Sequence, residues 1–434
     1  MTKKVDAIII GAGIIGCATA FELAKKGYKT LSIDKMGDAG SGSTSNSCAI
    51  IRFHYSTHEG ITMAYEGYFY WKDWANYLEA ADERGFARYR ETGMLVLNEY
   101  EGQYDRTIEH FKNIGVPFEE WDNDQVVNRY PLGTGLYGPP KLPAEDGFWD
   151  DPHGSLAGGI YNPQGGYVTD PQLATHNLMR AAEAKGGEFI FNAEVAKVHR
   201  DAGRVAGVTL KDGTRIDAPI VVNAAGPHSF VINRMAGVEE GMKIKTNALR
   251  HEVHTVPSPA GFNYEQDGVV AHCADVGVYW RPEVGNSLIV GSADPDCDPK
   301  EWVADPDHFA REVTEERWKA QVYRLAKRMP TLEIPNTARG LVDLYDVSDD
   351  WIPIYDKSDL PGFYMAVGTS GNQFKNAAVA GHLMSELIDA CEHGHDHDAD
   401  PVQVMCRYTP HTLDAGFYSR RREINAESSF SVLG

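Results

Sequence analysis

The chain has 434 residues, of which 42% are hydrophobic, and its formal net charge is −21. This length favours about two or three domains over a single small core. The negative charge argues against a nucleic-acid partner, which would need a basic surface, and no stretch reaches the roughly 20 consecutive apolar residues of a membrane helix.

Targeting and metal signals are weak. The first apolar stretch lies so close to Met1 that no room is left for a signal or transit peptide, so we expect a cytoplasmic protein without a membrane span. The six cysteines form no C-x-x-C pair, which favours ordinary reduced thiols. The His-rich stretch 393–398 has metal-ligand residue types but lies in a polar tail, so we expect adventitious binding there and no metal centre.

The most informative stretch is a glycine motif near the start of the chain. A predicted strand, Ala7–Ile10, leads into Gly11, Gly13 and Gly16, which open a predicted helix, Ile14–Lys26. A second apolar stretch then ends at Asp34. Glycines let a pyrophosphate approach the backbone at a helix N-terminus, and the acid suits ribose hydroxyl groups. The combination predicts a βαβ unit that binds a dinucleotide.

The middle of the chain mixes both kinds of element. A Ser-rich loop, 40–48, precedes a predicted helix at 59–81. The segment 93–143 contains a short predicted strand at 94–97 and has the Pro/Gly punctuation of an insertion. Dinucleotide-domain character returns at Asp170. The elements expected there are a helix to about 185, strands at 188–191, 194–198 and 220–223, and a hairpin turning at 212–213.

The last part of the chain begins with β-type alternation from 241 to 291, followed by a predicted amphipathic helix at 306–328. A predicted strand, 363–367, then runs into the glycine turn 371–375 and a helix that ends near 390. A strand, glycine turn and helix in this order predict a second phosphate- or flavin-facing loop. We expect the tail from 391 to 434 to be extended or wrapped on the surface.

These residues carry a family resemblance. The 11–16 glycine motif, Asp34, the Ser/Thr loop ending at Arg52, the strand end at Ala225-Gly226 and the 371–375 turn occur in an order similar to that of the D-amino acid oxidase superfamily. Within it, the chain most resembles the sarcosine oxidase and dimethylglycine dehydrogenase branch. The resemblance implies FAD as the cofactor.

The resemblance also implies the fold. It predicts an α/β protein in which a Rossmann-like FAD-binding domain, a βαβ unit with GxGxxG, carries an α+β substrate domain built on a large mixed or antiparallel sheet. The discontinuous FAD-binding domain would comprise 1–90, 145–235 and 335–390; the substrate domain would comprise 91–144 and 236–334, leaving the tail 391–434.

The resemblance suggests how a substrate is held. Arg52 and Lys375 match an arginine and a lysine that bind the substrate carboxylate in monomeric sarcosine oxidases, and an arginine fork with a lysine point charge suits that role. The alternative is that each of these two cations only forms a salt bridge with an acidic residue on the surface. We expect Trp280 to face the flavin, with core packing as the alternative, and His251 either to line the cavity or to satisfy a strand hydrogen bond. The residues assigned to FAD binding are Gly11, Gly13, Ile14, Ile15, Gly16, Asp34, Lys35, Ser43, Thr44, Ser45, Ser47, Val195, Ala225, Gly226, Gly371, Asn372, Gln373, Phe374 and Lys375.

The chain departs from the family pattern at two points. Ile289 stands where oxygen-using sarcosine oxidases carry a lysine beneath the flavin, which leaves open whether oxygen or a protein or quinone is the electron acceptor. No cysteine occurs near 342–345, and Ser45-Asn46-Ser47 replaces the histidine of the dimethylglycine dehydrogenase branch. His54 and His58 lie slightly downstream, but we expect FAD to be bound noncovalently.

The leading functional prediction is oxidation of the C–N bond of an N-methylated or other secondary or tertiary amino acid, by hydride transfer to the flavin N5 and hydrolysis of the resulting imine. Two alternatives remain. One is a D-amino acid or 2-hydroxy acid dehydrogenase of the same superfamily, and the other is an FAD-binding subunit without turnover of its own. The expected ligand is a small carboxylate-bearing amine.

Overall fold

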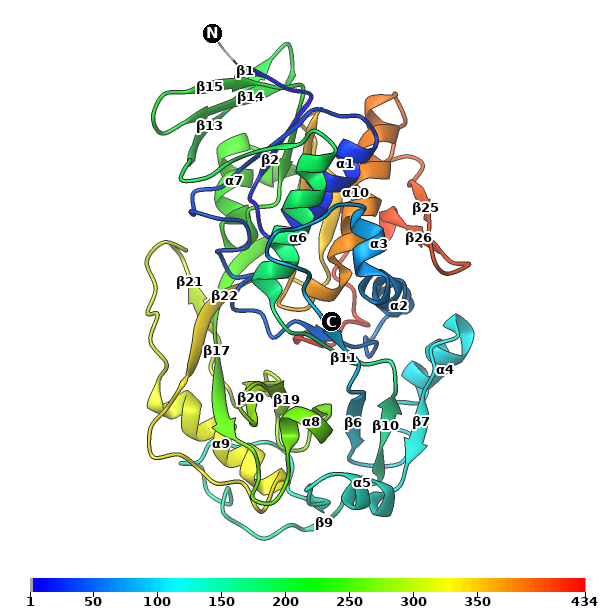
Figure 1. Cartoon of the computed structure of the whole chain (residues 1–434), viewed down its shortest axis with the longest axis vertical. Helices are drawn as coiled ribbons and strands as arrows, with labels where there is room; N and C mark the ends of the chain where they lie inside the picture. Colours follow the sequence, from blue (N-terminus) through cyan, green and yellow to red (C-terminus); the bar gives the residue numbers. More distant parts are fainter. Residues whose placement is uncertain (1–2, 434) are drawn as a thin grey trace.

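The computed structural model describes residues 3–433 and has two main parts, shown one above the other in Figure 1. The upper part is built on a six-stranded sheet in which all neighbours are parallel except the last pair. This confirms the Rossmann-like α/β class. The strands in spatial order are β12 (Glu188–Ile190), β3 (Thr30–Ile33), β2 (Ala7–Ile10), β16 (Ile220–Asn223), β24 (Phe363–Val367) and β23 (Ile354–Lys357).

Both faces of this sheet are covered, because its strands are apolar on both sides. Ala7 and Ile9 pack against one face's helices, whereas Ile8 and Ile10 pack on the opposite face. The helices of the first face are α1 (Ile14–Lys25), α6 (Pro171–Ala184) and α10 (Ala377–Glu392). The second face is covered by α7 (Ser229–Ala236) and a four-stranded sheet of β1 (Lys3–Lys4), β15 (Arg215–Asp217), β14 (Arg204–Leu210) and β13 (Val195–Asp201).

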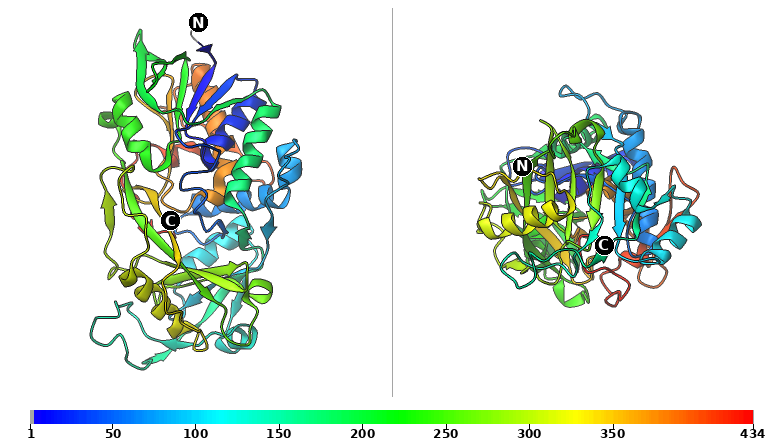
Figure 2. Two further views of the ribbon diagram at one scale, coloured as in Figure 1. Left: turned by 60° about the vertical axis from the view of Figure 1, so that its left-hand side comes forward. Right: turned by 90° about the horizontal axis from the view of Figure 1, so that it is seen from below.

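The lower part is built on a nine-stranded mixed sheet whose neighbours are antiparallel except for one parallel pair. Helix α9 (Glu315–Arg328) packs on one face of it, and the opposite face is turned toward the upper part (Figures 1 and 2). Its strands in spatial order are β21 (Glu301–Val303), β17 (Thr246–Pro257), β20 (Ser287–Ser292), β19 (Val278–Glu283), β18 (Val270–Cys273), β6 (Met94–Asn98), β10 (Gly158–Asn162) and β7 (Glu119–Trp121), and β22 (Gly340–Ser348) pairs with β17.

Smaller elements connect the two parts. Strand β4 (Ile50–Ile51), which follows the Ser-rich loop, pairs with β11 (Gly166–Val168), and β11 pairs in turn with β5 (Tyr89–Arg90). The remaining elements are α2 (His58–Lys72), α3 (Trp74–Leu78), α4 (Asp105–Ile114), α5 (Asn123–Arg129), α8 (Tyr264–Asp267), the pair β8 (Gly135–Leu136) and β9 (Gly154–Ser155), the pair β25 (Gln403–Met405) and β26 (Thr412–Asp414), and short 3₁₀ turns at 226–228, 239–241, 374–376 and 415–418.

Two predicted helices differ from the structure. The helix expected at 59–81 is broken at Asp73, so that α3 follows α2 as a separate turn. The helix expected at 306–328 begins only at Glu315, because the Thr314 side chain caps it by accepting a hydrogen bond from the Arg317 amide. The residues before Thr314 instead form a loop that passes beside a large cavity.

The tail from 391 onward is not simply a surface segment. It contains the β25–β26 hairpin, and it buries Arg420 completely among Asp356, Asp359 and Asp398. The last described residues, red in Figure 1, return to the region between the upper and lower parts.

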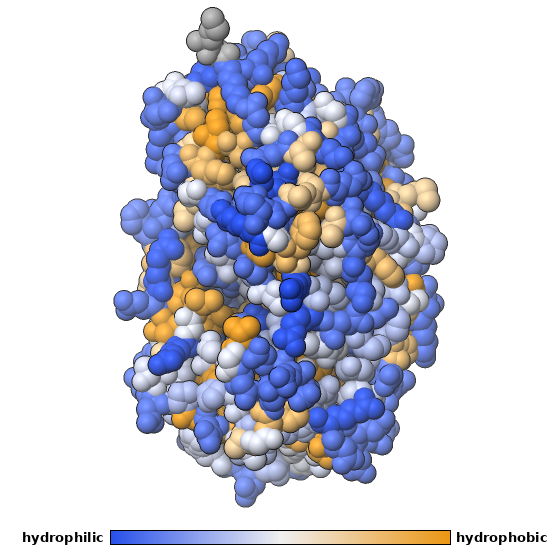
Figure 3. Space-filling view, viewed as in Figure 1, coloured by the Kyte–Doolittle hydropathy of each residue, from blue (hydrophilic) through white to orange (hydrophobic). Residues whose placement is uncertain are grey.

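The hydrophilic surface and the character of the helices agree with the moderate content of hydrophobic residues in the sequence. The face shown in Figure 3 is mostly hydrophilic, with apolar side chains gathered in separate patches. Within residues 3–433, none of the helices has both the length and the apolar character needed to cross a membrane.

Candidate active site

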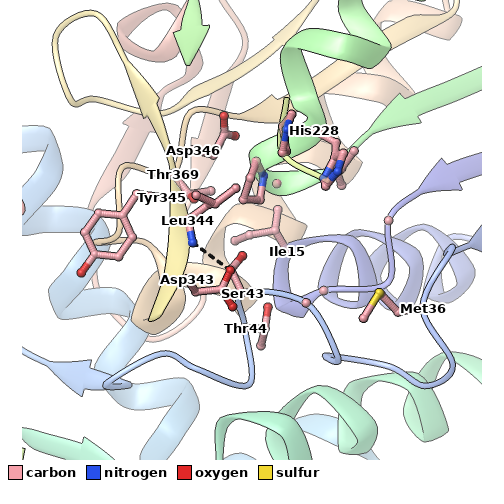
Figure 4. A pocket seen from close by; sticks show the side chains of 18 of the residues that line it. Ile15, Met36, Ser43, Thr44, His228, Asp343, Leu344, Tyr345, Asp346 and Thr369 are labelled. Atoms are coloured by element: carbon pink, nitrogen blue, oxygen red, sulfur yellow. Dashed lines mark hydrogen bonds between the residues drawn. The ribbon is translucent and has the colours of Figure 1, made fainter. Parts of the chain in front are cut away.

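A cavity of about 430 Å³ lies where the carboxyl ends of β2, β3, β16 and β24 meet. Ligands of parallel α/β sheets bind at this edge. In Figure 4, Met36 and Tyr345 stand on opposite sides of the view, with Ser43 and Thr44 between them. The cavity is therefore elongated and runs from the upper sheet past the Ser-rich loop toward β22 of the lower sheet.

The glycine motif shapes one wall of this cavity. Gly11 has a φ of +107°, and a Cβ there would lie 2.3 Å from the Ala224 carbonyl oxygen. Gly16 is equally constrained, since its Cβ would stand 2.0 Å from the Gly11 oxygen. Gly13 differs because it lines the cavity and has only the Thr44 hydroxyl nearby. The N-cap residue of α1, Gly13, has no side chain to cap the helix, and the first turn has no acidic residue, which suits the binding of a phosphate. The Ile14 amide donates to the Thr44 hydroxyl at 3.2 Å.

Asp34 is fixed at the cavity wall by two backbone amides. Its Oδ2 atom accepts a hydrogen bond of 2.7 Å from the Ala12 amide, and its Oδ1 atom accepts one of 2.8 Å from the Met36 amide. A carboxylate held in this way keeps lone pairs for further donors, such as the hydroxyl groups of a ribose.

A smaller cavity of about 50 Å³ adjoins the large one. The two share the residues Ser47, Tyr345, Gly371 and Phe374, so a group bound in one lies next to a group bound in the other. The smaller cavity is lined by side chains from β4, β18 and β19 and from the 371–375 turn.

Arg52 and Lys375 both line the smaller cavity, and both are almost completely buried. The Arg52 guanidinium lies 4.5 Å from the centre of the Tyr55 ring, and the Lys375 ammonium donates to the Tyr55 hydroxyl at 2.8 Å and to the Asn372 carbonyl at 2.6 Å. Among residues 3–433, no carboxylate forms an ion pair with either cation.

Burial costs both cations solvation. It lowers the pKa of Arg52, and burial together with the positive charge of Arg52 holds the pKa of Lys375 well below its ordinary value. An anion placed between the two side chains would reverse part of this effect, since opposite charge favours the protonated forms. The two cations therefore make the smaller cavity electrostatically favourable for an anion.

Comparison with known proteins decides the family. A family model described as FAD dependent oxidoreductase matches residues 6–387 of this chain. The chain belongs to this family. The large cavity has the features that FAD needs, namely a glycine turn where a Cβ would collide with backbone and a fixed carboxylate for the ribose, and it is called the FAD cavity below. The resemblance predicted from the sequence is confirmed, and the protein is an FAD-dependent oxidoreductase.

Curated relatives match along most of the chain. The sarcosine oxidase subunit beta of Rhodobacter capsulatus is 26% identical, with 89% of this chain and 85% of the relative covered. The glycine oxidase of Geobacillus kaustophilus is 25% identical, with 91% and 96% covered.

Solved structures share the fold. The L-proline dehydrogenase of P. horikoshii superposes with a TM-score of 0.75 at 22% identity, covering 97% of this chain and 98% of that one. The glycine oxidase structure from Geobacillus kaustophilus gives a TM-score of 0.71 at 20% identity, covering 98% and 100%.

Most residues predicted to bind FAD line the large cavity. Gly16 and Ser45 do not: Gly16 packs on the glycine turn, and the Ser45 hydroxyl donates to the Gly42 carbonyl. Asn372 and Lys375 line the smaller cavity instead. The predicted residues that line the large cavity are Gly11, Gly13, Ile14, Ile15, Asp34, Lys35, Ser43, Thr44, Ser47, Val195, Ala225, Gly226, Gly371, Gln373 and Phe374.

The expected orientation of Trp280 is wrong. Its side chain is fully buried in the core beneath α9, where its Nε1 atom donates to the Tyr264 hydroxyl at 2.6 Å. Strand alternation turns Tyr279 to the opposite face, where it lines the smaller cavity. His251 lines the FAD cavity, with its ring stacked on Tyr345 and its Nε2 atom 2.8 Å from Asp294.

Several cavity residues escaped the sequence analysis. His272 lines the smaller cavity, its Nδ1 atom has no hydrogen-bond partner among the described residues, and burial lowers its pKa to about 3, so its imidazole is neutral. Its surroundings in the sequence, Val269 to Cys273, read as an ordinary core strand. Cys48, taken as one of six unremarkable thiols, lines the FAD cavity.

Three polar side chains in the wall of the FAD cavity, Lys35, His228 and Asp307, contact one another. His228, which follows the Ala225-Gly226 strand end, lies 2.7 Å from the Lys35 ammonium and 3.0 Å from the Asp307 carboxylate. Lys35 also pairs with Asp307, which belongs to the loop mistaken for the start of α9. Only the three-dimensional structure brings these three segments together, so no local sequence pattern signals the contact.

Proposed function

We propose that the protein oxidises the C–N bond of a small amino acid whose nitrogen is methylated or otherwise secondary or tertiary, such as sarcosine or dimethylglycine. The observation that carries the proposal is the pair of buried cations, Arg52 and Lys375, in a cavity that adjoins the FAD cavity. The names of the relatives, a sarcosine oxidase subunit and a glycine oxidase, support a small amino acid as the substrate.

Each cation has a distinct task in binding the carboxylate. The planar fork of Arg52 can donate two parallel hydrogen bonds, which fixes the direction of the carboxylate, and Lys375 adds a point charge from the 371–375 turn. Both side chains are held by Tyr55, which restricts their motion. Orientation of this kind supplies much of the rate when the reacting carbon must stand close to its hydride acceptor.

The same charges affect the substrate nitrogen. Two nearby cations disfavour a third positive charge, so they lower the pKa of the substrate ammonium and favour the neutral amine. The neutral His272 imidazole lies in the same cavity, and its unpartnered nitrogen can accept a hydrogen bond from the N–H group of a secondary amine such as sarcosine. A neutral amine can release hydride from its α-carbon or its N-methyl carbon without a further base.

When bound, FAD supplies the hydride acceptor at its N5 atom. By losing a hydride, the substrate loses two electrons and one proton and becomes an iminium cation. Water then adds to the C=N carbon, and the adduct separates into an aldehyde, a shorter amine and a proton. We propose noncovalent attachment of FAD. Acid precipitation of the yellow protein tests this: colour that stays in the pellet would point to a covalent bond, for which Cys48 in the cavity lining is a candidate nucleophile.

The proposal is tested by Arg52→Ala and Lys375→Ala in steady-state assays with sarcosine and dimethylglycine. Each change removes hydrogen bonds to a charged group, so KM should rise roughly 10- to 150-fold while FAD stays bound. Arg324→Lys is the matched control, because this buried arginine pairs with Asp298 outside both cavities. Unchanged kinetics in both alanine variants would refute the assignment.

The substrate panel should include D-amino acids and 2-hydroxyglutarate, assayed by anaerobic bleaching of the flavin. Bleaching by a 2-hydroxy acid or a D-amino acid alone would replace the proposed substrate class, and bleaching by none would favour a subunit without turnover. Repeating the assay with oxygen and with a dye identifies the acceptor. Ile289 is buried beside Tyr279, at the position where oxygen-using sarcosine oxidases carry a lysine. Because a cation there would favour the reaction with oxygen, we propose that oxygen reoxidises the reduced flavin of this protein slowly.

A further inference from the structure

The segment Ser428–Leu433 reaches into the smaller cavity. Val432 and Leu433 both line this cavity, although they lie far in sequence from its other residues. The Val432 side chain is buried in a small apolar cluster that includes Tyr279 and Ile289. This part of the chain therefore stands where a substrate of the proposed class would bind.

The contact with Arg52 is the important one. The Nη2 atom of Arg52 donates to the Val432 carbonyl, and its Nη1 atom donates to the Leu433 carbonyl at 3.1 Å and to the His54 carbonyl. Two successive carbonyl oxygens thus occupy both ends of the guanidinium fork. A carboxylate bound to the same fork would need the same donors.

The space that remains supports this reading. A cavity of about 50 Å³ holds roughly four water molecules. An amino acid is larger than that, and its carboxylate would have to stand where the Val432 carbonyl lies. Binding of such a substrate to Arg52 requires the segment to move.

The segment is joined to firmly fixed residues on its N-terminal side. Arg422 donates to both carboxylate oxygens of the buried Asp350, and the Asn425 amide donates to the same residue at 3.4 Å. Beyond Asn425, the contacts change. Ser428, Ser429 and Ser431 bond mainly within the segment, and the ion pair between Glu427 and Arg106 is exposed.

We propose that Ser428–Leu433 is an intramolecular ligand of Arg52 that competes with the substrate carboxylate and is displaced when substrate binds. The competition is unequal in kind, because a carboxylate forms charge-assisted hydrogen bonds with the guanidinium whereas the segment offers neutral carbonyls. The segment gains from its high effective concentration, since it belongs to the same chain. The inference rests on the proposed carboxylate role of Arg52.

The segment therefore raises the apparent Kd of the substrate, which equals the intrinsic Kd divided by the fraction of molecules in which the segment has left Arg52. Anions that do not fit the emptied cavity cannot displace the segment by charge alone.

The first test is deletion of residues 426–434 in the FAD-loaded protein. We expect KM to fall roughly tenfold, the worth of about one hydrogen bond to a charged group, with little change in kcat. Val432→Gly, which removes the buried side chain but keeps the chain length, should lower KM in the same direction and serves if the deletion variant does not fold. Ile424→Ala, an exposed residue before the segment, should leave KM unchanged. An unchanged or raised KM in both variants would overturn the proposal.

The second test needs no turnover. A synthetic peptide with the sequence Ser-Ser-Phe-Ser-Val-Leu-Gly and an amidated end is added to the deletion variant, and binding is followed through the flavin absorbance. Binding that is lost in Arg52→Gln supports the proposal, and absence of binding to the deletion variant contradicts it. If the peptide binds but no amino acid is oxidised, the proposed function fails while the role of the segment stands. If KM depends on Arg52 but neither the deletion nor the peptide has an effect, the proposed function stands and the proposed role of the segment fails.

Discussion

Among the residues that the structure describes, the two positive charges in the smaller cavity have no carboxylate partner. Arg52 and Lys375 come from opposite ends of the chain, yet Tyr55 contacts both. Their burial is costly unless an anion joins them, because a charge removed from water needs a compensating partner. The backbone carbonyls that contact Arg52 and Lys375 compensate for this cost only in part, which is consistent with the proposed binding of a carboxylate.

Lys375 makes carboxylate binding depend on pH. Its pKa is lowered by burial and by Arg52, so the protonated fraction falls as pH rises through a value below the ordinary one. We expect the Kd of an unreactive carboxylate such as acetate to increase over that range, measured by perturbation of the flavin spectrum. Lys375→Arg keeps its charge throughout and should flatten the profile. A Kd that does not vary with pH in the unmodified protein would contradict this prediction.

At the scale of elements, the turn between β2 and α1 contains two glycines with different roles. Gly11 is needed by the fold, because its φ is positive and a Cβ would collide with the Ala224 backbone. Gly13 lines the FAD cavity, and the nearest atom to a Cβ there is the Thr44 hydroxyl oxygen at 3.1 Å, at the end of a side chain that can shift slightly. The two positions therefore allow folding and cofactor binding to be tested apart.

Gly11→Ala should lower the thermal stability of the protein even without FAD, whereas Gly13→Ala should leave the stability of the FAD-free protein nearly unchanged and reduce the stabilisation that added FAD produces. Thermal unfolding with and without FAD measures both effects. Equal losses in the FAD-free forms of the two variants would show that Gly13 also serves the fold.

Local pattern predicted the elements that have a strong period or a strong motif. The βαβ unit and the 371–375 turn could be located because glycines sit at a fixed place beside a strand end, whereas Arg52 and Lys375 were located through the family resemblance. Trp280 was misplaced because alternation fixes which residues share a face but not which face meets the flavin. The start of α9 was misplaced because the cap at Thr314 competes with a longer amphipathic pattern.

At the scale of the whole molecule, the division of the strands between the two sheets differs from the domain limits predicted along the chain. Strands β10 and β22 both belong to the large lower sheet, where β10 pairs with β6 and β22 pairs with β17. Both strands lie in segments that the sequence analysis assigned to the FAD-binding domain. Strand pairing depends on contacts distant in sequence, so local pattern gives no signal for it. The proposed domain limits stay a prediction, and the sheets suggest that these two strands belong with the substrate part.

The tail is held to the upper part by a buried arginine. Arg420 contacts Asp356, Asp359 and Asp398, and it holds the pKa of Asp398 well below the ordinary value. Arg420→Met would leave these carboxylates without their partner, so we expect a loss of about 3–5 kcal/mol in the free energy of unfolding. Arg421→Met is the matched control: Arg421 touches Asp359 and Asp398 from a half-exposed position, and the loss should stay below about 1 kcal/mol.

Denaturant unfolding of the two variants measures the difference. The depressed pKa of Asp398 implies stability that is present at neutral pH and lost as pH falls through the acid range toward that pKa. The acid-induced loss should therefore be smaller in Arg420→Met than in the unmodified protein. Similar losses in both arginine variants would show that the buried position of Arg420 confers no special stability.

The FAD cavity also has a consequence for biosynthesis. One of its walls is the turn at Gly11, and another is the loop that ends at Phe374, late in a chain of 434 residues. During translation at about 5–20 residues per second, the second wall follows the first by roughly 20–70 s. The nascent chain can present its pyrophosphate turn early but cannot enclose the cofactor until nearly the whole chain has been made. Loading of FAD is therefore a late event. The supply of FAD limits the yield of loaded enzyme only after synthesis is almost complete.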